Sequence, residues 1–217
     1  MHRTGLVIFD GVTLLDVGGP AEVLSRVPQF TDGGYEQRLL SLEAGAVPTA
    51  AGIPLTTDGP PGAGDRFDTL IVAGGERLVA ERIEPELLAL VERAAARSRR
   101  VASVCTGAFL LAEVGLLDGR RATTHWRHAA TLARRYPSID VVDDAISVAD
   151  GAVHTSAGVS AGIDLALALV ESDHGSAVAR AVARELVVFL QRPGGQSQFS
   201  VATSSPAPRR TRLPTTP

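Results

Sequence analysis

Short apolar runs alternate with helical patterns along most of the chain. Continuous apolar or β-branched runs predict strands buried on both faces, at residues 6–9, 35–42, 69–75 and 101–104. Between them lie two helical patterns, one at residues 19–27 with a proline near its start and one with a 3.6-residue period at 84–98. Later strands are predicted at residues 139–142, 146–150 and 152–156, and later helices near residues 162–170 and 177–191.

This alternation predicts the fold class and the domain organisation. Strands that alternate with helices favour an α/β fold, in which helices sandwich a doubly wound, mostly parallel sheet. The stretch 44–64 is rich in Pro and Gly and predicts a hairpin around Ile53–Thr57. The last residues, 201–217, hold four prolines and many Ser and Thr residues. We therefore expect one domain over residues 1–200, followed by a disordered tail over residues 201–217.

The charge balance argues against nucleic-acid binding by the expected domain. The formal net charge is −3, and all 21 basic residues are arginines. Three of these arginines lie in the tail, which leaves 18 Arg against 24 Asp and Glu in residues 1–200, a net charge of −6. A body this acidic is poorly suited to contact a phosphate backbone. We expect no specific DNA binding by this chain alone.

Other features bear on the cellular compartment. No apolar run approaches the length that a bilayer crossing requires, and the apolar stretch at the N-terminus is too short for a signal peptide. The single cysteine, Cys105, excludes an internal disulfide framework. These features predict a cytoplasmic protein with no membrane partner.

The strongest local signal for chemistry surrounds Cys105. A buried strand ends at this residue, Thr106 and Gly107 turn the chain, and a helical pattern follows directly. This order is typical of a nucleophile elbow, which presents a side chain at the carboxyl edge of the sheet. A helix N-terminus beneath the sulfur would stabilise the thiolate, so we expect a low pKa and an accessible thiol. The alternative is that Cys105 fills space in the core, as cysteines often do.

Four segments together resemble a known family. They are VIFDGVTLLDVGGPAEVL, SVCTGAFLLAEVGLLDGRRATTHW, HTSAGVSAGIDLALALV and RPGGQSQFS. The chain resembles the ThiJ/PfpI superfamily over residues 4–200, and most closely the N-terminal domains of GlxA-like, AraC-family transcriptional regulators. The resemblance implies a flavodoxin-like, amidotransferase-like fold with a site at Cys105. Only the tail follows Ser200, so we expect the helix-turn-helix module of those regulators to be missing.

The resemblance also implies roles for residues around the cysteine. Asp16 would lie beside the sulfur, as the equivalent Asp does in isonitrile hydratases, and the two groups would titrate as a coupled pair. A backbone N–H at Gly74 or Gly75 would act with that of Thr106 as an oxyanion-hole-like pair. Each position also has a structural alternative, since an Asp at a helix start and a glycine at a strand end are common without function.

His125 occupies the position where several superfamily members carry a histidine near the cysteine. Such a histidine would orient or deprotonate the thiol. His125 and His128 have the spacing of a metal-binding pair, but no third ligand has suitable spacing, so we expect neither a metal nor a cofactor. Trp126 either lines the pocket or anchors a helix.

Two other segments complete the expected site and its surroundings. The resemblance places Thr155, Ser156 and Gly158 in a loop that borders the site, with packing as the alternative. At the end of the apolar helix, the polar side chains are expected to face solvent; they are those of Glu171, Asp173 and His174.

Two functions from different classes fit these features. The first is a ligand-sensing and dimerisation domain of a GlxA-like regulator, with a small-molecule ligand and a homodimer as its partners. The second is a cysteine-dependent hydratase or amidase similar to isonitrile hydratase, in which Cys105 attacks the isonitrile carbon and Asp16 moves the proton. The RPGGQSQFS segment favours the regulator, whereas Asp16 and Thr106 favour the enzyme.

Overall fold

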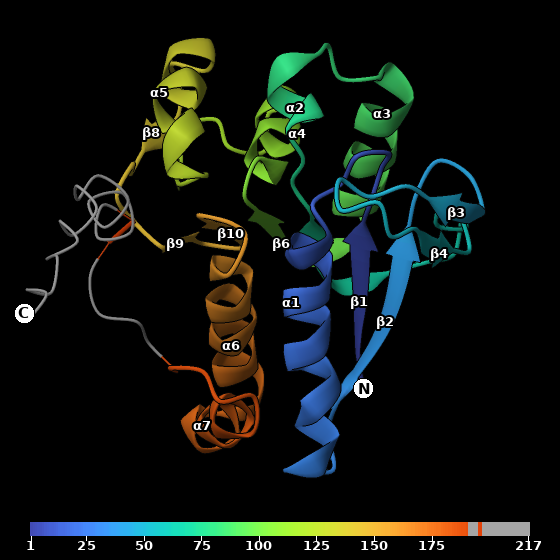
Figure 1. The fold of residues 1–217 in the computed structure, drawn as a ribbon, viewed down its shortest axis with the longest axis vertical. Helices are drawn as coiled ribbons and strands as arrows, with labels where there is room; N and C mark the ends of the chain where they lie inside the picture. Colours follow the sequence, from blue (N-terminus) through green and yellow to red (C-terminus); the bar gives the residue numbers. More distant parts are fainter. Residues whose placement is uncertain (191–194, 197–217) are drawn as a thin grey trace, which may run out of the picture.

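A six-stranded sheet forms the centre of the computed structural model, which describes residues 1–190, 195 and 196 (Figure 1). Its strands lie in the order β2-β1-β5-β6-β10-β9. They are β1 (His2–Val7), β2 (Tyr35–Leu40), β5 (Phe67–Val72), β6 (Ser98–Val104), β9 (Ser147–Asp150) and β10 (Val153–Ser156). All neighbouring pairs are parallel except β9 and β10, which are antiparallel. The predicted mostly parallel sheet is confirmed, and the expected tail lies outside the described residues.

Helices cover both faces of this sheet. One face carries α1 (Leu14–Arg26), α6 (Ala161–His174) and α7 (Ser176–Glu185), and α1 lies beside α6 in Figure 1. The other face carries α3 (Pro85–Ala95) and α4 (Gly107–Glu113). The remaining elements are short: η1 (Val27–Gln29), α2 (Arg77–Ala80), α5 (Trp126–Arg135), and the paired strands β3 (Gly45–Val47) with β4 (Leu55–Thr57) and β7 (Arg121–Ala122) with β8 (Asp140–Val141).

The core follows from the continuous apolar runs of the strands. Helices on both faces require apolar side chains on both faces of each central strand. In β5, for example, Leu70, Ile71 and Val72 are consecutive and all buried. Phe109 of α4 is among the largest fully buried side chains. Within the described residues, no helix combines the length and apolar character needed to cross a membrane.

Two helix ends differ most from the predicted ones. Helix α1 begins at Leu14 rather than at residue 19, because its first turns already bury Asp16 and Val17. Helix α7 ends at Glu185 rather than at residue 191, because a Schellman motif closes it. The N–H of Val188 donates to the Ala183 carbonyl (2.9 Å), and Val187 takes the left-handed conformation (φ 56°). Glycine is the usual residue at this left-handed position. Because this chain has valine there, its sequence did not indicate where the helix ends.

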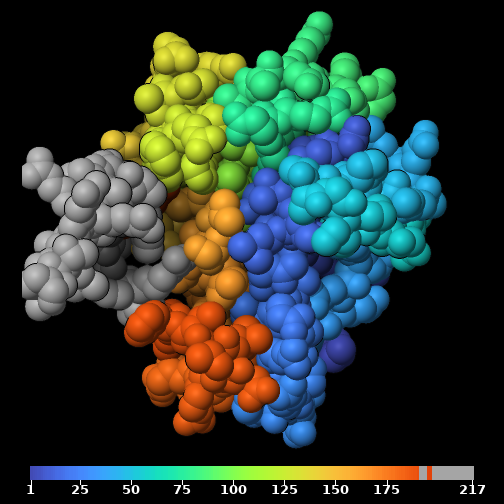
Figure 2. All heavy atoms as spheres, viewed as in Figure 1, coloured from blue at the N-terminus to red at the C-terminus, as the bar shows by residue number. Residues whose placement is uncertain are grey.

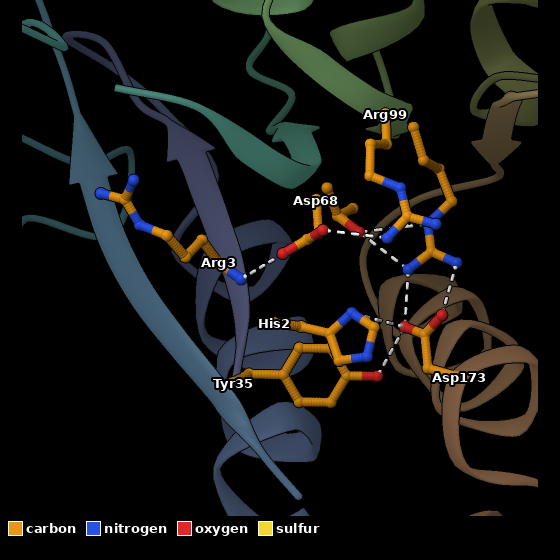
Figure 3. Close-up of polar contacts among 8 residues, drawn as sticks. His2, Arg3, Tyr35, Asp68, Arg99 and Asp173 are labelled. Carbon is orange, nitrogen blue, oxygen red and sulfur yellow. Dashed lines mark hydrogen bonds and ion pairs between the residues drawn. The ribbon is translucent and has the colours of Figure 1, made fainter. Parts of the chain in front are cut away.

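Asp173 was expected to face solvent, but this is wrong. It belongs to a polar cluster between the end of α6 and the strands β1, β2 and β6 (Figure 3). The Arg100 guanidinium donates to both Asp173 oxygens, at 3.1 and 2.7 Å, and the Tyr35 hydroxyl donates to Oδ2 at 2.8 Å. The ring of His174 lies edge-on to those of His2 and Tyr35, with centroids 5.4 Å apart in both pairs. The end of α6 is therefore fixed to β1, β2 and β6.

Candidate functional site

Cys105 lies on a tight turn between β6 and α4. Its backbone is left-handed (φ 58°), a conformation that non-glycine residues adopt rarely and that tends to occur at functional sites. The Cys105 N–H donates to the Ser156 carbonyl (3.0 Å), and its carbonyl accepts a hydrogen bond from the Thr124 hydroxyl (2.8 Å). The predicted nucleophile elbow therefore exists, and neighbouring segments hold its backbone on both sides.

Three glycines allow other segments to approach the elbow closely. A Cβ on Gly158 would lie 2.7 Å from the Cys105 sulfur, and one on Gly74 would lie 2.8 Å from the Cys105 Cβ. A Cβ on Gly107 would lie 3.0 Å from the Ala73 carbonyl oxygen. These contacts leave no room for a side chain at any of the three positions. The close cover of Gly158 also leaves Cys105 only 7% exposed.

Asp16 reaches the elbow from the first turn of α1. Its Oδ2 accepts from the Gly74 N–H (3.2 Å) and its Oδ1 from the Val159 N–H (2.8 Å). Complete burial raises the pKa of Asp16 to about 6, against the opposing effect of these two N–H groups and of the Cys105 thiol. This carboxyl group can therefore gain or lose a proton near neutral pH.

The expected low pKa of Cys105 is contradicted. Burial, and next the negative charge of Asp16, raise the pKa of this thiol to about 12, although hydrogen bonds from Thr106 act in the opposite direction. The N-terminus of α4, a helix of seven residues, does not overcome these effects. Cys105 is therefore a protonated thiol that donates a hydrogen bond to Asp16.

The N–H groups expected to hold a developing negative charge have partners within the protein. The Gly74 N–H donates to Asp16, and the Gly75 N–H donates to the Thr106 hydroxyl oxygen (2.8 Å). This hydroxyl in turn donates to the Gly75 carbonyl (2.8 Å), while the Thr106 N–H contacts the sulfur. A reaction that needs an oxyanion hole would first have to break one of these hydrogen bonds.

His125 lies at the start of α5, where its Nδ1 accepts from the Arg127 N–H (3.3 Å). Within the described part of the chain, no hydrogen bond joins His125 to Cys105. Burial lowers the pKa of His125, and the nearby charges of His128 and Arg127 lower it further. His125 is therefore a neutral imidazole beside the site.

A cavity of about 140 Å³ lies next to the elbow. It is bounded by His125 and Trp126, by the loop after β10, and by a residue near the end of the described chain; its lining is His125, Trp126, Ile146, Ala157, Gly158, Val159, Ser160, Ala161 and Gln196. Of the loop residues predicted to border the site, Gly158 lines this cavity. Ser156 does not, because its hydroxyl donates to the Ser103 carbonyl (3.3 Å) and lies buried in the sheet.

Sequence reasoning missed Val159 and Gln196. Val159 holds Asp16 through its N–H and has a left-handed backbone (φ 50°), which is rare for a β-branched residue. A valine in a glycine-rich loop carries no signal for either role. Gln196 lies in the RPGGQSQFS segment that the resemblance drew attention to, but nothing in the sequence indicates where its side chain lies.

Two further features lie outside this site. His128 bonds Glu76 through Nε2 (3.2 Å), and among the residues described no group of three His, Cys, Asp or Glu side chains is placed to hold a metal. A larger cavity of about 300 Å³ lies between the β3–β4 hairpin and helices α2 and α3. None of the predicted site residues lines this cavity. The candidate site is therefore the smaller cavity beside Cys105.

Comparisons with known proteins show which sequences and folds the chain resembles. The sequence profile described as the DJ-1/PfpI family matches residues 2–172. The chain is 32% identical to the HTH-type transcriptional regulator CdhR of Pseudomonas aeruginosa over 91% of its own length and 58% of that protein. It is 33% identical to the isonitrile hydratase of Pseudomonas putida over 85% of its length and 77% of that enzyme.

A solved structure shares the fold. An AraC family transcriptional regulator from Pseudomonas putida superposes with a TM-score of 0.77 at 22% identity, over 86% of this chain and 100% of that one. Among the curated relatives, the chain thus spans little more than half of CdhR and about three quarters of the hydratase.

Proposed function

Given that the chain belongs to the DJ-1/PfpI family, we propose that it is the ligand-sensing and dimerisation domain of an AraC-type transcriptional regulator. The ligand would be a small molecule that enters the cavity beside Cys105. DNA contact would belong to a separate module, as the acidic balance of residues 1–200 suggests. The regulators among its relatives and the state of the thiol both support this proposal.

The observation that supports sensing most directly is the enclosure of the Cys105 sulfur. A nucleophile that turns over substrate must be reachable and must have donors ready for the charge that develops. Here Gly158 covers the sulfur, and the N–H groups of Gly74 and Gly75 are bonded within the protein. The site is built to hold a thiol and a carboxyl group together rather than to expose a thiolate.

A sensing role has a physical basis in the Cys105–Asp16 pair. Asp16 holds two loops through the N–H groups of Gly74 and Val159, and its charge depends on what lies beside it. A ligand that binds near Val159 would change the environment of this carboxyl group. The loop after β10 would then shift its preferred position, which is how differential contacts move a conformational equilibrium.

The test combines a melting experiment with a turnover experiment. The protein is melted in the presence of small amides, amino-acid derivatives and alkyl isonitriles, and each compound is then assayed for consumption. We expect at least one compound to raise the melting temperature of the parent but not of Trp126→Ala, and to be recovered unchanged. Steady conversion of any of them by the parent would overturn the sensing proposal.

A second candidate function, isonitrile hydration, is favoured by the pKa of Asp16 near 6. In that reaction the Cys105 thiol adds across the isonitrile carbon to give a thioimidate, with its proton passing through Asp16 to the substrate. Water then attacks the same carbon, and the N-substituted formamide leaves as the thiol is restored. If this is the activity, Cys105→Ser and Asp16→Asn each abolish formamide production, whereas His125→Ala reduces it much less.

A further inference from the structure

Gln196 is a buried glutamine with an unusually complete set of partners. Its side chain is only 4% exposed, although it lies beyond the last helix of the domain. Four oxygens of two loops lie within hydrogen-bond distance of Nε2 and share its two N–H groups: Thr123 Oγ1 (3.3 Å), Thr124 O (3.1 Å), Asp143 O (3.0 Å) and Ala145 O (2.9 Å). Its Oε1 accepts from the Trp126 N–H at 2.8 Å. The carboxamide therefore joins the loop before α5 to the loop before β9.

The backbone at this position is docked as well. The Gln196 N–H donates to the Asp144 carbonyl (2.9 Å). A Cβ on the preceding residue, Gly195, would meet the carboxyl group of the exposed Asp144 side chain, which would have to turn away to make room. Gln196 is thus held against the candidate site both by its backbone N–H and by its buried side chain.

The two loops held by Gln196 are parts of the candidate site. Thr124, whose carbonyl Gln196 contacts, donates its own hydroxyl to the carbonyl of Cys105. Trp126 and Gln196 both line the cavity of about 140 Å³ that also includes Val159. Two hydrogen bonds therefore connect Gln196 to the elbow, and its side chain forms one wall of the pocket.

We propose that Gln196 is a positioning residue that completes the ligand pocket only when residues 195 and 196 are docked, so that pocket occupancy and docking are coupled. Because such coupling is reciprocal, a ligand that fits the complete pocket favours docking, and one that displaces the carboxamide favours release. When Gln196 leaves, the Trp126 N–H loses its acceptor and the carbonyls of Thr124, Asp143 and Ala145 each lose a donor, which makes the two states distinct rather than continuous. This inference rests on the proposed sensing function.

The test compares Gln196→Ala with Gln37→Ala in the full chain. Gln37 lies on β2 and its carboxamide donates to the Ala21 carbonyl (3.0 Å), so the control removes a similar group far from the site. We expect Gln196→Ala to raise the rate of Cys105 alkylation by iodoacetamide at least fivefold and to shift its pH profile to lower pH. Amide hydrogen exchange should also increase at residues 122–126 and 143–146, while Gln37→Ala changes none of these.

A second variant keeps the proposal testable if Gln196→Ala folds poorly. Gln196→Glu keeps the size of the side chain and an oxygen for the Trp126 N–H, but it replaces the Nε2 donor with an oxygen facing the carbonyls of Thr124, Asp143 and Ala145. It should therefore produce the same faster alkylation and the same local exchange. Unchanged alkylation and exchange in a folded Gln196→Ala or Gln196→Glu protein would overturn the coupling. So would an increase spread evenly over the domain, because that indicates a loss of global stability. None of these readouts requires turnover or a known ligand, so the coupling and the sensing function can fail separately.

Discussion

The thiol of Cys105 and the carboxyl group of Asp16 occupy one buried environment, which decides how both titrate. The elbow itself was predictable, because a buried strand, a short turn and a helical pattern follow one another in the sequence. The direction in which the pKa of the thiol shifts was not predictable from the sequence. Gly158 and Val159, which cover the sulfur and hold Asp16, come from a loop more than fifty positions further along the chain.

Replacing Gly158 tests the close cover of the sulfur. In Gly158→Ala the new methyl group would meet Cys105, and the residue would also need a left-handed backbone (φ +94°). We expect a loss of about 3 kcal/mol in the free energy of unfolding, measured by urea denaturation. Gly175→Ala is the matched control, since its φ is +85° and nothing lies within 4 Å of its Cβ position. Equal losses in the two variants would show that Gly158 does not pack against the elbow.

Replacing Asp16 tests the raised pKa of its carboxyl group. Because its pKa rises from 3.8 to about 6 on folding, the protonated form stabilises the fold, and this contribution is lost as the pH rises through about 6. From about pH 4 to pH 8, unfolding free energies of the parent should therefore fall by about 2 kcal/mol relative to those of Asp16→Asn. A difference between the two proteins that stays constant over this range would contradict the assignment.

At the scale of elements, the parallel strands were predictable and the polar cluster under them was not. Continuous apolar runs indicate strands buried on both faces, whatever their partners. Asp173, in contrast, lies at the end of an apolar helix, where charged residues are usually solvated. Its partners Arg100 and Tyr35 lie 73 and 138 positions away, so only the tertiary fold brings them together (Figure 3).

Asp173→Asn tests whether this cluster fastens α6 to the sheet. Burial alone would raise the pKa of Asp173, but hydrogen bonds from Arg100 and Tyr35 outweigh it and hold the pKa below its ordinary value. The carboxylate therefore stabilises the fold above about pH 4, and the effect is lost as the pH falls through the lowered pKa. At pH 7 we expect the substitution to cost about 3 kcal/mol by urea denaturation.

The control for this substitution is Glu22→Gln, which breaks an exposed ion pair with Arg26 on α1. Surface pairs of this kind contribute roughly 0.5 kcal/mol. The Asp173→Asn loss should also shrink as the pH is lowered below about 4. A loss of unfolding free energy no larger than that of Glu22→Gln would show that the cluster does not stabilise the attachment of α6 to the sheet.

At the scale of the whole molecule, the sheet gathers the site at its carboxyl edge. Asp16 follows β1, Gly74 follows β5, and Cys105 follows β6, so a parallel sheet predicts their proximity. What the sequence could not predict is the arrangement of the cavity, because its walls come from loops after β7 and β10 and from Gln196. Those segments have no periodic pattern that fixes their conformation.

The expected homodimer has a candidate surface on α1 and the loop between β3 and β4, whose surfaces adjoin in Figure 2. This surface is mainly apolar and includes Leu15, which is 42% exposed; its lining is Thr13, Leu14, Leu15, Gly18, Ala50 and Ala51. An exposed apolar patch of this kind is typical of interfaces. We expect Leu15→Arg to convert a dimer to a monomer of 22.6 kDa in light scattering. A parent that is monomeric across a concentration series would contradict the proposal.

The central claim is that the Cys105 site holds a covered, protonated thiol, and the pH dependence of its alkylation tests this most directly. The single cysteine makes the measurement specific without any substitution. With a pKa raised to about 12, the rate should be slow at neutral pH and should still be rising without a plateau at about pH 10. A rate that levels off with an apparent pKa below about 8.5, the value of a free thiol, would contradict the account and favour a thiolate ready for catalysis.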